Sequence, residues 1–339
     1  MKILFFSHSF YPSVGGIETV SMQLATNFEE RTDVLIIVVS RTKEIGNWQL
    51  PFEVVRDPST KKLVSLLKWC DVVFENNPCF GMSWLNFIIR KPKVVALHTW
   101  IVVPGTKITL LQKLKKTMLT DYNAVIACSN KIKLYTFEKS QVIENAYDTT
   151  LYVDNKESKN KDFVFLGRLV SDKGADMCIE LIQELKKNDR KEYSLTIIGD
   201  GPEMEYLKEL TKTYNLNHQI RFLGFLKGIA IVRELNNHRF LLVPSRWEEP
   251  FGLVVLEGMA CGCIPIVSDG GGLPDAVGKA GVLFKRNSLL SLVQTTKKLL
   301  ENNADQTNLI QLANAHLSLH THKEVSQRYF NVILKALKL

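Results

Sequence analysis

Short apolar runs alternate with amphipathic stretches from one end of the sequence to the other. The runs are rich in β-branched residues and apolar on both faces, which is typical of buried strands in a parallel sheet. Between them, stretches such as 203–210 and 253–260 have the pattern of helices. The predicted strands are residues 3–6, 34–39, 72–74, 94–97, 124–127, 163–166, 194–198, 220–223, 240–243 and 264–267.

Two successive series of five strands predict an α/β protein built from two doubly wound, Rossmann-like domains. We expect the first domain at residues 1–150, the second at 151–318 and a helical C-terminal segment at 319–339. The polar run 154–162 has no periodicity and is expected at or beside the connection between the domains. The apolar face of residues 324–337 is expected either to cover the second domain or to cross back to the first.

The composition is that of an ordinary globular protein. Of 339 residues, 45% are hydrophobic and 23% are charged, which excludes a disordered chain, a collagen and a disulfide-stapled miniprotein. The longest apolar run, 34–39, is far shorter than the ~20 residues of a membrane helix, and we see no secretory signal. The six cysteines form no C-x-x-C pair and lie near no cluster of histidines, so we expect reduced, mostly buried thiols and no metal site.

The chain is basic, with a formal net charge of +8. Residues 1–150 hold 18 basic against 13 acidic residues, and the remainder holds 25 against 22. The excess therefore leans toward the N-terminal half, where it suits anionic ligands or an anionic membrane surface. Because the sequence has neither zinc-finger spacing nor an RNA-binding aromatic motif, we expect no nucleic-acid partner.

Two features of the N-terminal half are candidates for a ligand site. Gly15 and Gly16 lie between the first predicted strand and a helix, where small residues let the backbone approach a phosphate or a sugar. A tight loop is the alternative. No G-x-G-x-x-G is present, which argues against a nicotinamide dehydrogenase. His98 directly follows the strand 94–97, at an end that lines the ligand crevice of such sheets, although a purely structural histidine is the alternative.

A basic turn opens the second half. Gly167 and Arg168 follow the strand 163–166, and Lys173 comes five residues later. Two cations at a strand-to-helix turn can bind a diphosphate, although a solvated basic turn has the same sequence.

The segment 244–272 carries the most specific pattern. Glu249 lies between the strand 240–243 and a helix that contains Glu257. Glu257 can accept two hydrogen bonds from a vicinal diol, as a ribose offers, and Glu249 can reach a sugar hydroxyl. The helix would begin with open amides that can hold a phosphate, at Gly252, Leu253 and Val254.

With these motifs the sequence resembles the retaining glycosyltransferases of family 4, which have the two-domain GT-B fold. The resemblance covers essentially the whole chain and implies two Rossmann-like domains that face each other across a cleft. It rests on Gly15-Gly16-x-Glu18, His98, the run 145–148, Gly167-Arg168, Lys173-Gly174, the turn 199–202, Gly224 and the Glu249…Glu257 pair. Two departures are Ala146, where the family usually has Gly, and Asp275, where it usually has Glu.

The resemblance implies a role for each candidate residue. Arg168 and Lys173 are expected to hold the nucleotide diphosphate, Glu257 the ribose, and Glu249 the donor sugar, while His98 lies close to the transferred sugar. The implied donor-binding residues are Gly15, Gly16, Arg168, Lys173, Glu249, Phe251, Gly252, Leu253, Val254 and Glu257. The implied catalytic residues are His98, Glu249, Arg168 and Lys173.

Glycosyl transfer builds negative charge on the leaving diphosphate, and some group must stabilise it. The sequence contains no Asp-x-Asp pair of the kind that holds a divalent metal in transferases of another fold. Arg168, Lys173 and helix N-termini can replace the metal, so we expect neither a metal nor a cofactor. No carboxylate is placed as a covalent nucleophile, and the resemblance implies front-face transfer with retention.

The expected function is the transfer of a hexose from a UDP-sugar, with UDP-glucose favoured, to a hydroxyl acceptor in polysaccharide or glycolipid assembly. One alternative is a mannosyltransferase that uses GDP-mannose. Another is a nucleotide-sugar 2-epimerase, which shares the fold and releases a free sugar. A third is a sugar-nucleotide-binding module without activity. No pattern in the sequence identifies the acceptor.

Residues 106–120 read TKITLLQKLKKTMLT and predict an amphipathic helix. Ile108, Leu111, Leu114 and Met118 share one face, and lysines lie opposite them. Such a helix can lie on an anionic leaflet, although an ordinary surface helix has the same pattern. We therefore expect a cytoplasmic protein that can contact the inner face of the membrane.

Overall fold

The computed structural model describes residues 1–13, 15–43, 49–188 and 192–338. The chain forms two compact units. The first contains Met1–Ala146 together with the C-terminal residues from His322, and the second contains Tyr147–Thr321. The boundaries fall a few residues from the expected 150 and 318.

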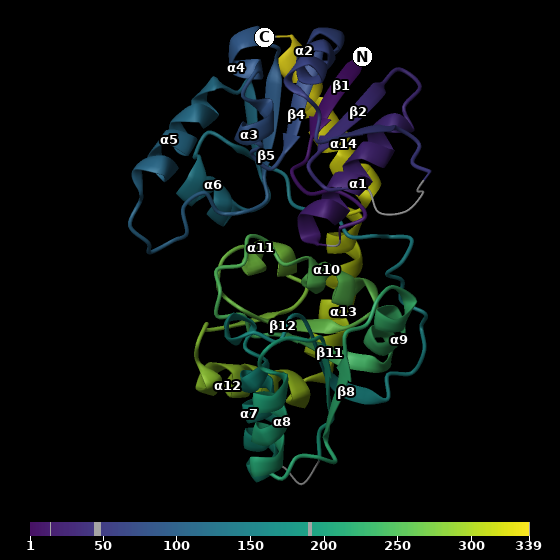
Figure 1. Cartoon of the computed structure of the whole chain (residues 1–339). Coiled ribbons are helices and arrows are strands. Elements are labelled where there is room, and N and C mark those ends of the chain that lie inside the picture. Colours follow the sequence, from purple (N-terminus) through teal and green to yellow (C-terminus); the bar gives the residue numbers. More distant parts are fainter. Residues whose placement is uncertain (14, 44–48, 189–191, 339) are drawn as a thin grey trace. The chain divides into compact units, whose positions relative to one another are not determined.

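The first unit is built on a parallel sheet of seven strands in the order β3-β2-β1-β4-β5-β6-β7 (Figure 1). β4 and β5 are buried along their whole length, which explains their continuous apolar runs. The strands are β1 (Lys2–Phe6), β2 (Leu35–Ser40), β3 (Glu53–Arg56), β4 (Val72–Asn76), β5 (Lys93–Leu97), β6 (Ala124–Ala127) and β7 (Gln141–Val142).

Helices cover both faces of this sheet. The α-helices of the unit are α1 (Gly16–Glu29), α2 (Thr60–Trp69), α3 (Phe80–Ser83), α4 (Asn86–Ile89), α5 (Leu110–Met118), α6 (Asn130–Thr136) and α14 (His322–Leu337). On one face α14 packs against α1 and the central strands, with the ring of Tyr329 5.9 Å from that of Phe74 (Figure 1). On the other face Leu63, Leu66 and Leu67 of α2 pack on the sheet. Of the two expectations for the last helix, the structure shows the one in which it joins the first unit.

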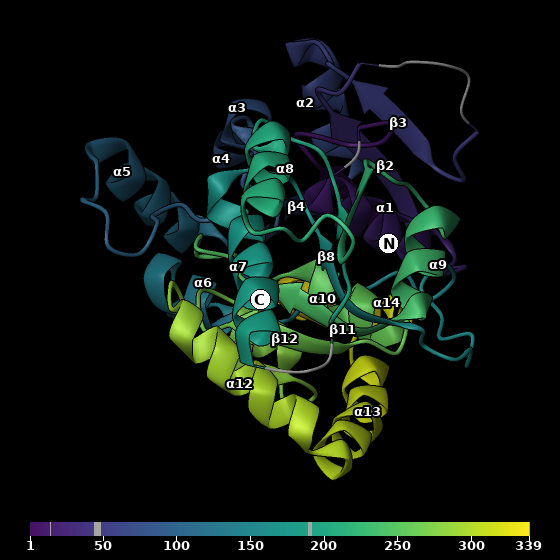
Figure 2. The same cartoon turned by 90° about the horizontal axis from the view of Figure 1, so that it is seen from below.

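The second unit is built on a parallel sheet of six strands in the order β10-β9-β8-β11-β12-β13. The strands are β8 (Lys161–Leu166), β9 (Leu195–Ile198), β10 (Ile220–Gly224), β11 (His238–Val243), β12 (Ile264–Ser268) and β13 (Val282–Phe284). The α-helices are α7 (Ala175–Asn188), α8 (Met204–Thr213), α9 (Ile229–Asn237), α10 (Leu253–Ala260), α11 (Leu273–Val277), α12 (Leu289–Glu301) and α13 (Asn303–Ser318). α7 packs between α8 and α12 (Figure 2). α10 and α13 pack together beside β12.

The predicted α/β class with two doubly wound sheets is confirmed. All ten predicted strands are present, with ends within two residues of the prediction, whereas the short edge strands β3, β7 and β13 were not predicted. The run 154–162 is not itself the connection between the units. It belongs to the second unit, where Lys159 Nζ donates to the carbonyls of Asn236 and Cys261. The chain passes from the first unit to the second between Ala146 and Tyr147, seven residues before this run begins.

All six cysteines are buried and free. Within the described ranges, no helix combines the length and the apolar character that crossing a bilayer requires.

Candidate functional site

The order of strands in the second sheet reverses between β8 and β11. In doubly wound sheets, ligands bind beyond the carboxyl ends of the strands at such a reversal. Arg168 follows β8, and Glu249 lies on the loop that follows β11. The candidate residues of the C-terminal half therefore come from the two strands that flank the reversal.

Lys173 and Glu249 are in direct contact. The Lys173 ammonium forms an ion pair with Glu249 Oε1, and Ser245 Oγ donates a hydrogen bond to the same oxygen at 2.9 Å. Arg168 is exposed, and within the described ranges no carboxylate pairs with it. The turn after β8 thus presents one cation bound to a carboxylate and one cation that is open to a ligand.

Backbone hydrogen bonds join the turn after β8 to the turn after β11. The carbonyl of Asp172 accepts from the amides of Arg246 and Trp247 at 2.7 and 3.1 Å. The Arg246 guanidinium also donates two bonds to the carboxylate of Asp176, at 2.8 and 2.7 Å. Because both turns are fixed to each other, Lys173 and Glu249 keep their relative positions without a ligand.

Two glycines make this close approach possible. Gly174 has φ +73°, and a Cβ there would lie 2.4 Å from the carbonyl oxygen of Pro244. Gly271 has φ +59°, and a Cβ there would lie 2.2 Å from the carbonyl oxygen of Glu249. Any other residue would push the loops apart, so the glycines of the predicted motifs act by letting backbones touch.

The N-terminus of α10 is open. Gly252 precedes it with φ +114°, and no side chain caps it. Within the described ranges, the amides of Gly252, Leu253 and Val254 donate to no acceptor. Open amides at the positive end of a helix attract an anion. Phe251 is buried and its ring lies 6.0 Å from that of His320, so only its backbone can face a ligand.

Glu257 lies one turn further along α10, largely buried. Burial raises the pKa of its carboxyl to about 7, and the hydroxyl of Tyr152 donates a hydrogen bond to it. A Cβ at Gly258 would lie 2.5 Å from the Leu241 side chain, so α10 is closely packed on β11 and fixes Glu257 in place. Sequence reasoning missed Tyr152, because a tyrosine shortly before a polar run carries no signal of its own.

His98 lies at the carboxyl end of β5 in the first unit and is buried. Its Nε2 lies 2.7 Å from Asn76 Oδ1, and Asn76 Nδ2 donates to Ser21 Oγ at 2.7 Å. Since the Asn76 nitrogen is used by Ser21, its oxygen faces His98 and Nε2 carries the proton. Burial lowers the pKa of His98 to about 4, so the ring is neutral and Nδ1 is an acceptor. Asn145 lies beside the ring.

Gly15 and Gly16 also belong to the first unit, at the start of α1. A Cβ on Gly15 would lie 2.4 Å from the carboxylate of Glu18, which folds back over the helix start. The candidate residues of the second half all lie in the second unit, with Lys173 and Glu249 in contact; they are Arg168, Lys173, Glu249, Phe251, Gly252, Leu253, Val254 and Glu257. Gly15, Gly16 and His98 lie in the other unit.

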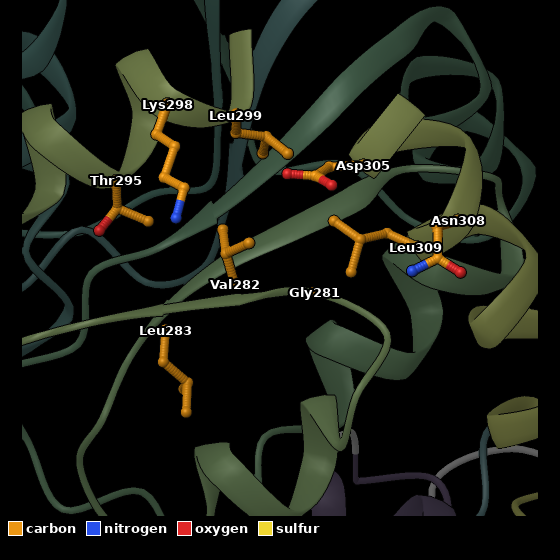
Figure 3. Close-up of a pocket in the computed structure, with 9 residues that line it drawn as sticks. All are labelled: Gly281, Val282, Leu283, Thr295, Lys298, Leu299, Asp305, Asn308 and Leu309. Atoms are coloured by element: carbon orange, nitrogen blue, oxygen red, sulfur yellow. The ribbon is translucent and has the colours of Figure 1, made fainter. Parts of the chain in front are cut away.

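Two other kinds of site on the second unit, a metal site and a second cavity, do not coincide with the candidate residues. Within the described ranges, no group of three or more His, Cys, Asp or Glu side chains is arranged to hold a metal ion. A cavity of about 490 Å³ lies beside the edge strand β13, between Lys298 of α12 and Asp305 of α13 (Figure 3). It borders the start of β13, away from the carboxyl ends where the candidate residues gather.

Comparison with known proteins agrees with this geometry. The sequence profile of the family described as glycosyl transferases group 1 matches residues 149–316. One component of the human phosphatidylinositol N-acetylglucosaminyltransferase is 24% identical over 88% of this chain and 68% of that protein. An uncharacterized glycosyltransferase of Methanocaldococcus jannaschii is 32% identical over 36% of this chain and only 30% of that protein.

Solved structures share the fold over the whole chain. The Anabaena protein HepE, solved with UDP and glucose, has a TM-score of 0.78 and 20% identity, covering 99% of this chain and 100% of that chain. A glycosyltransferase of Rickettsia africae has a TM-score of 0.80 and 14% identity, covering 99% and 98% of the two chains. Residues 149–316 therefore match the glycosyl transferases group 1 family, and the chain as a whole has the GT-B fold.

Proposed function

We propose that the protein transfers a hexose from a UDP-sugar to a hydroxyl acceptor, with retention of the anomeric configuration and without a metal. The observation that carries the proposal is the contact between Lys173 and Glu249 across the strand reversal, beside the open Arg168 and the open start of α10. A nucleoside diphosphate needs cations and amides for its phosphates and a carboxylate for its ribose, and these are the groups that gather there.

The diphosphate is assigned to Arg168, Lys173 and the amides at the start of α10. In the ligand-free structure Glu249 neutralises Lys173. When the phosphates bind, they compete with Glu249 for the ammonium, and the carboxylate becomes available to a sugar hydroxyl. Negative charge that develops on the leaving diphosphate is then met by fixed donors.

The reaction breaks the bond between the anomeric carbon and the phosphate oxygen and forms one to the acceptor oxygen. The acceptor proton passes to the departing phosphate oxygen on the same face of the sugar, which balances the transfer and retains the configuration. We assign to neutral His98 a place close to the transferred sugar, with Asn76 fixing the tautomer of its ring.

Names of similar proteins support the choice of a UDP-sugar. HepE was solved with UDP, with glucose and with UDP-glucose. Two curated relatives are named as N-acetylglucosaminyltransferases, one human and one from Niallia circulans. UDP-glucose remains our favoured donor, and UDP-N-acetylglucosamine is the alternative donor that these names support.

A donor panel tests the proposal. UDP-glucose, UDP-N-acetylglucosamine and GDP-mannose are each incubated with the full chain in EDTA, and nucleotide release is measured. We expect turnover of a UDP-sugar. We also expect His98→Ala to lower kcat at least tenfold while UDP still binds.

Turnover of GDP-mannose alone would contradict the choice of a uridine nucleotide and indicate a mannosyltransferase. A free epimerised sugar would indicate a 2-epimerase, and activity that EDTA abolishes and Mn²⁺ restores would contradict metal independence.

Nucleotide affinity should depend on pH through Glu257. Its ionised form accepts the ribose hydroxyls, and with a pKa of about 7 it is mostly protonated at pH 6. Glu257→Gln should weaken UDP binding by about 1–3 kcal/mol at pH 8. The ratio of the Kd values of variant and wild type should be smaller at pH 6 than at pH 8, by up to about tenfold, because most of the wild-type carboxyl is then protonated. Calorimetry at both pH values measures this, with Glu209→Gln on exposed α8 as control. A gap that does not change with pH would contradict the role.

We also propose that α5 contacts an anionic membrane surface. The helix buries none of its residues. Leu110, Leu111 and Leu114 are 83%, 61% and 57% exposed, and Lys113 lies between them in the sequence. Apolar side chains beside lysines are typical of helices that lie in the headgroup region.

Vesicle sedimentation tests the membrane contact. Leu111→Glu should lower binding to vesicles that contain phosphatidylglycerol by about tenfold or more, since a leucine contributes roughly 1.5–3 kcal/mol when it leaves water. Leu290→Glu, at a leucine 68% exposed on α12, should leave binding unchanged. Equal binding of both variants, or no binding by the wild type, would contradict the membrane contact and indicate that α5 is an ordinary surface helix.

A further inference from the structure

The first sheet also has a strand reversal, between β1 and β4. A cavity of about 390 Å³ lies beside it, where the loop after β1 meets the loop after β2. Its lining residues are His8, Ser9, Pro12, Ser13, Arg41, Thr42 and Lys43. Doubly wound sheets bind ligands beyond the carboxyl ends of their strands, and this cavity lies at that edge, next to the reversal. The function proposed above assigns no group to it.

Arg41 spans the reversal. It follows β2, and its Nη2 donates at 3.1 Å to the carbonyl of Gly81 in α3, the helix after β4. Because β1 lies between β2 and β4, the guanidinium crosses the carboxyl end of β1. One of its five N–H donors is used in this bond, and the others remain for a ligand.

The cavity has positive charge that no carboxylate offsets in the described part of the chain. Arg41 and Lys43 are exposed, and within the described residues neither forms an ion pair. The carboxylate of Glu75 is buried and accepts from Tyr122 and from the amide of Cys79, while that of Glu18 covers Gly15. Arg41 and Lys43 thus place part of the positive charge of residues 1–150 at the opening of this cavity.

The walls of the cavity are held together before any ligand binds. Arg56 donates to the carbonyls of Tyr11 and Thr42, each at 2.9 Å. The amide of Phe10 donates to Thr42 Oγ1 at 2.8 Å, and the amide of Arg41 donates to the carbonyl of His8 at 3.2 Å. A preorganised site loses less conformational entropy on binding, which favours its use as a binding pocket.

We propose that this cavity binds a phosphate or diphosphate group carried by the acceptor. A guanidinium matches two phosphate oxygens at once, and the nearby ammonium adds a point charge. The proposal rests on the proposed function and names its acceptor class: the hydroxyl that receives the sugar belongs to a phosphorylated molecule. Arg41 and Lys43 hold the acceptor and take no part in bond formation.

The test uses inorganic pyrophosphate as the probe and the full chain with Arg168→Ala and Lys173→Ala, which silences the candidate nucleotide site. Calorimetry should show binding, and adding Arg41→Ala and Lys43→Ala should weaken it about tenfold or more. Lys61→Ala with Lys68→Ala on α2 removes the same charge from the same unit and should have little effect. Arg41→Lys, which keeps the charge, should give an intermediate loss if bidentate contact matters.

Pyrophosphate that binds the Arg41/Lys43 variant as well as its parent, or does not bind the parent at all, would overturn the proposal. Two further probes distinguish the sources of the phosphate. Tighter binding of geranyl diphosphate supports a lipid-linked acceptor, and tighter binding of glucose 6-phosphate supports a soluble sugar phosphate. UDP binding to the chain with native Arg168 and Lys173 is measured separately, so failure of the nucleotide assignment is distinguishable from failure of this one.

Discussion

The contact on which the second unit's site depends is the hydrogen bonding between two turns, one after β8 and one after β11. The Asp172 carbonyl accepts from the amides of Arg246 and Trp247, and Gly174 lies directly on the backbone of Pro244. Because these backbones touch, a lysine from one turn and a glutamate from the other meet across the strand reversal. Without glycine at 174 the turns would separate, and the cation would lose both its partner and its position.

The electrostatics of the site follow from that contact. A ligand-free cluster of cations would repel itself and attract unrelated anions, and the Lys173–Glu249 pair offsets part of this charge. In the proposed function, a diphosphate takes the place of the Glu249 carboxylate at Lys173, so one anion replaces another and the protein needs little rearrangement. Burial raises the pKa of Glu257 to about 7, and the proposed recognition of the ribose therefore depends on the protonation state of this carboxyl.

Much of this architecture is visible in the sequence. Continuous apolar runs predicted the buried central strands, and the residues that follow β8 and β11 could be placed at the sheet edge from strand order. β3, β7 and β13 escaped prediction because edge strands are short and half-exposed. The run 154–162 lies beside the connection rather than in it, because polarity looks the same in a connection and in a surface loop.

Contacts between side chains that are distant in the sequence could not be predicted from it. The hydrogen bond from Tyr152 to Glu257 joins residues 105 positions apart, and the tautomer of His98 is set by Asn76 on the neighbouring strand. The crossing of Arg41 over β1 likewise depends on which strands are neighbours. Such partners are determined by topology and packing, which a local pattern does not encode.

Hydrogen exchange of the full chain with and without UDP tests the central claim most directly, that the second unit alone supplies the nucleotide site. The account predicts that UDP slows exchange in peptides covering 166–176 and 248–259, where the amides at the start of α10 acquire acceptors. Exchange around His98 and Arg41 in the first unit should not change. Protection confined to peptides of the first unit, at UDP concentrations where calorimetry shows binding, would contradict it.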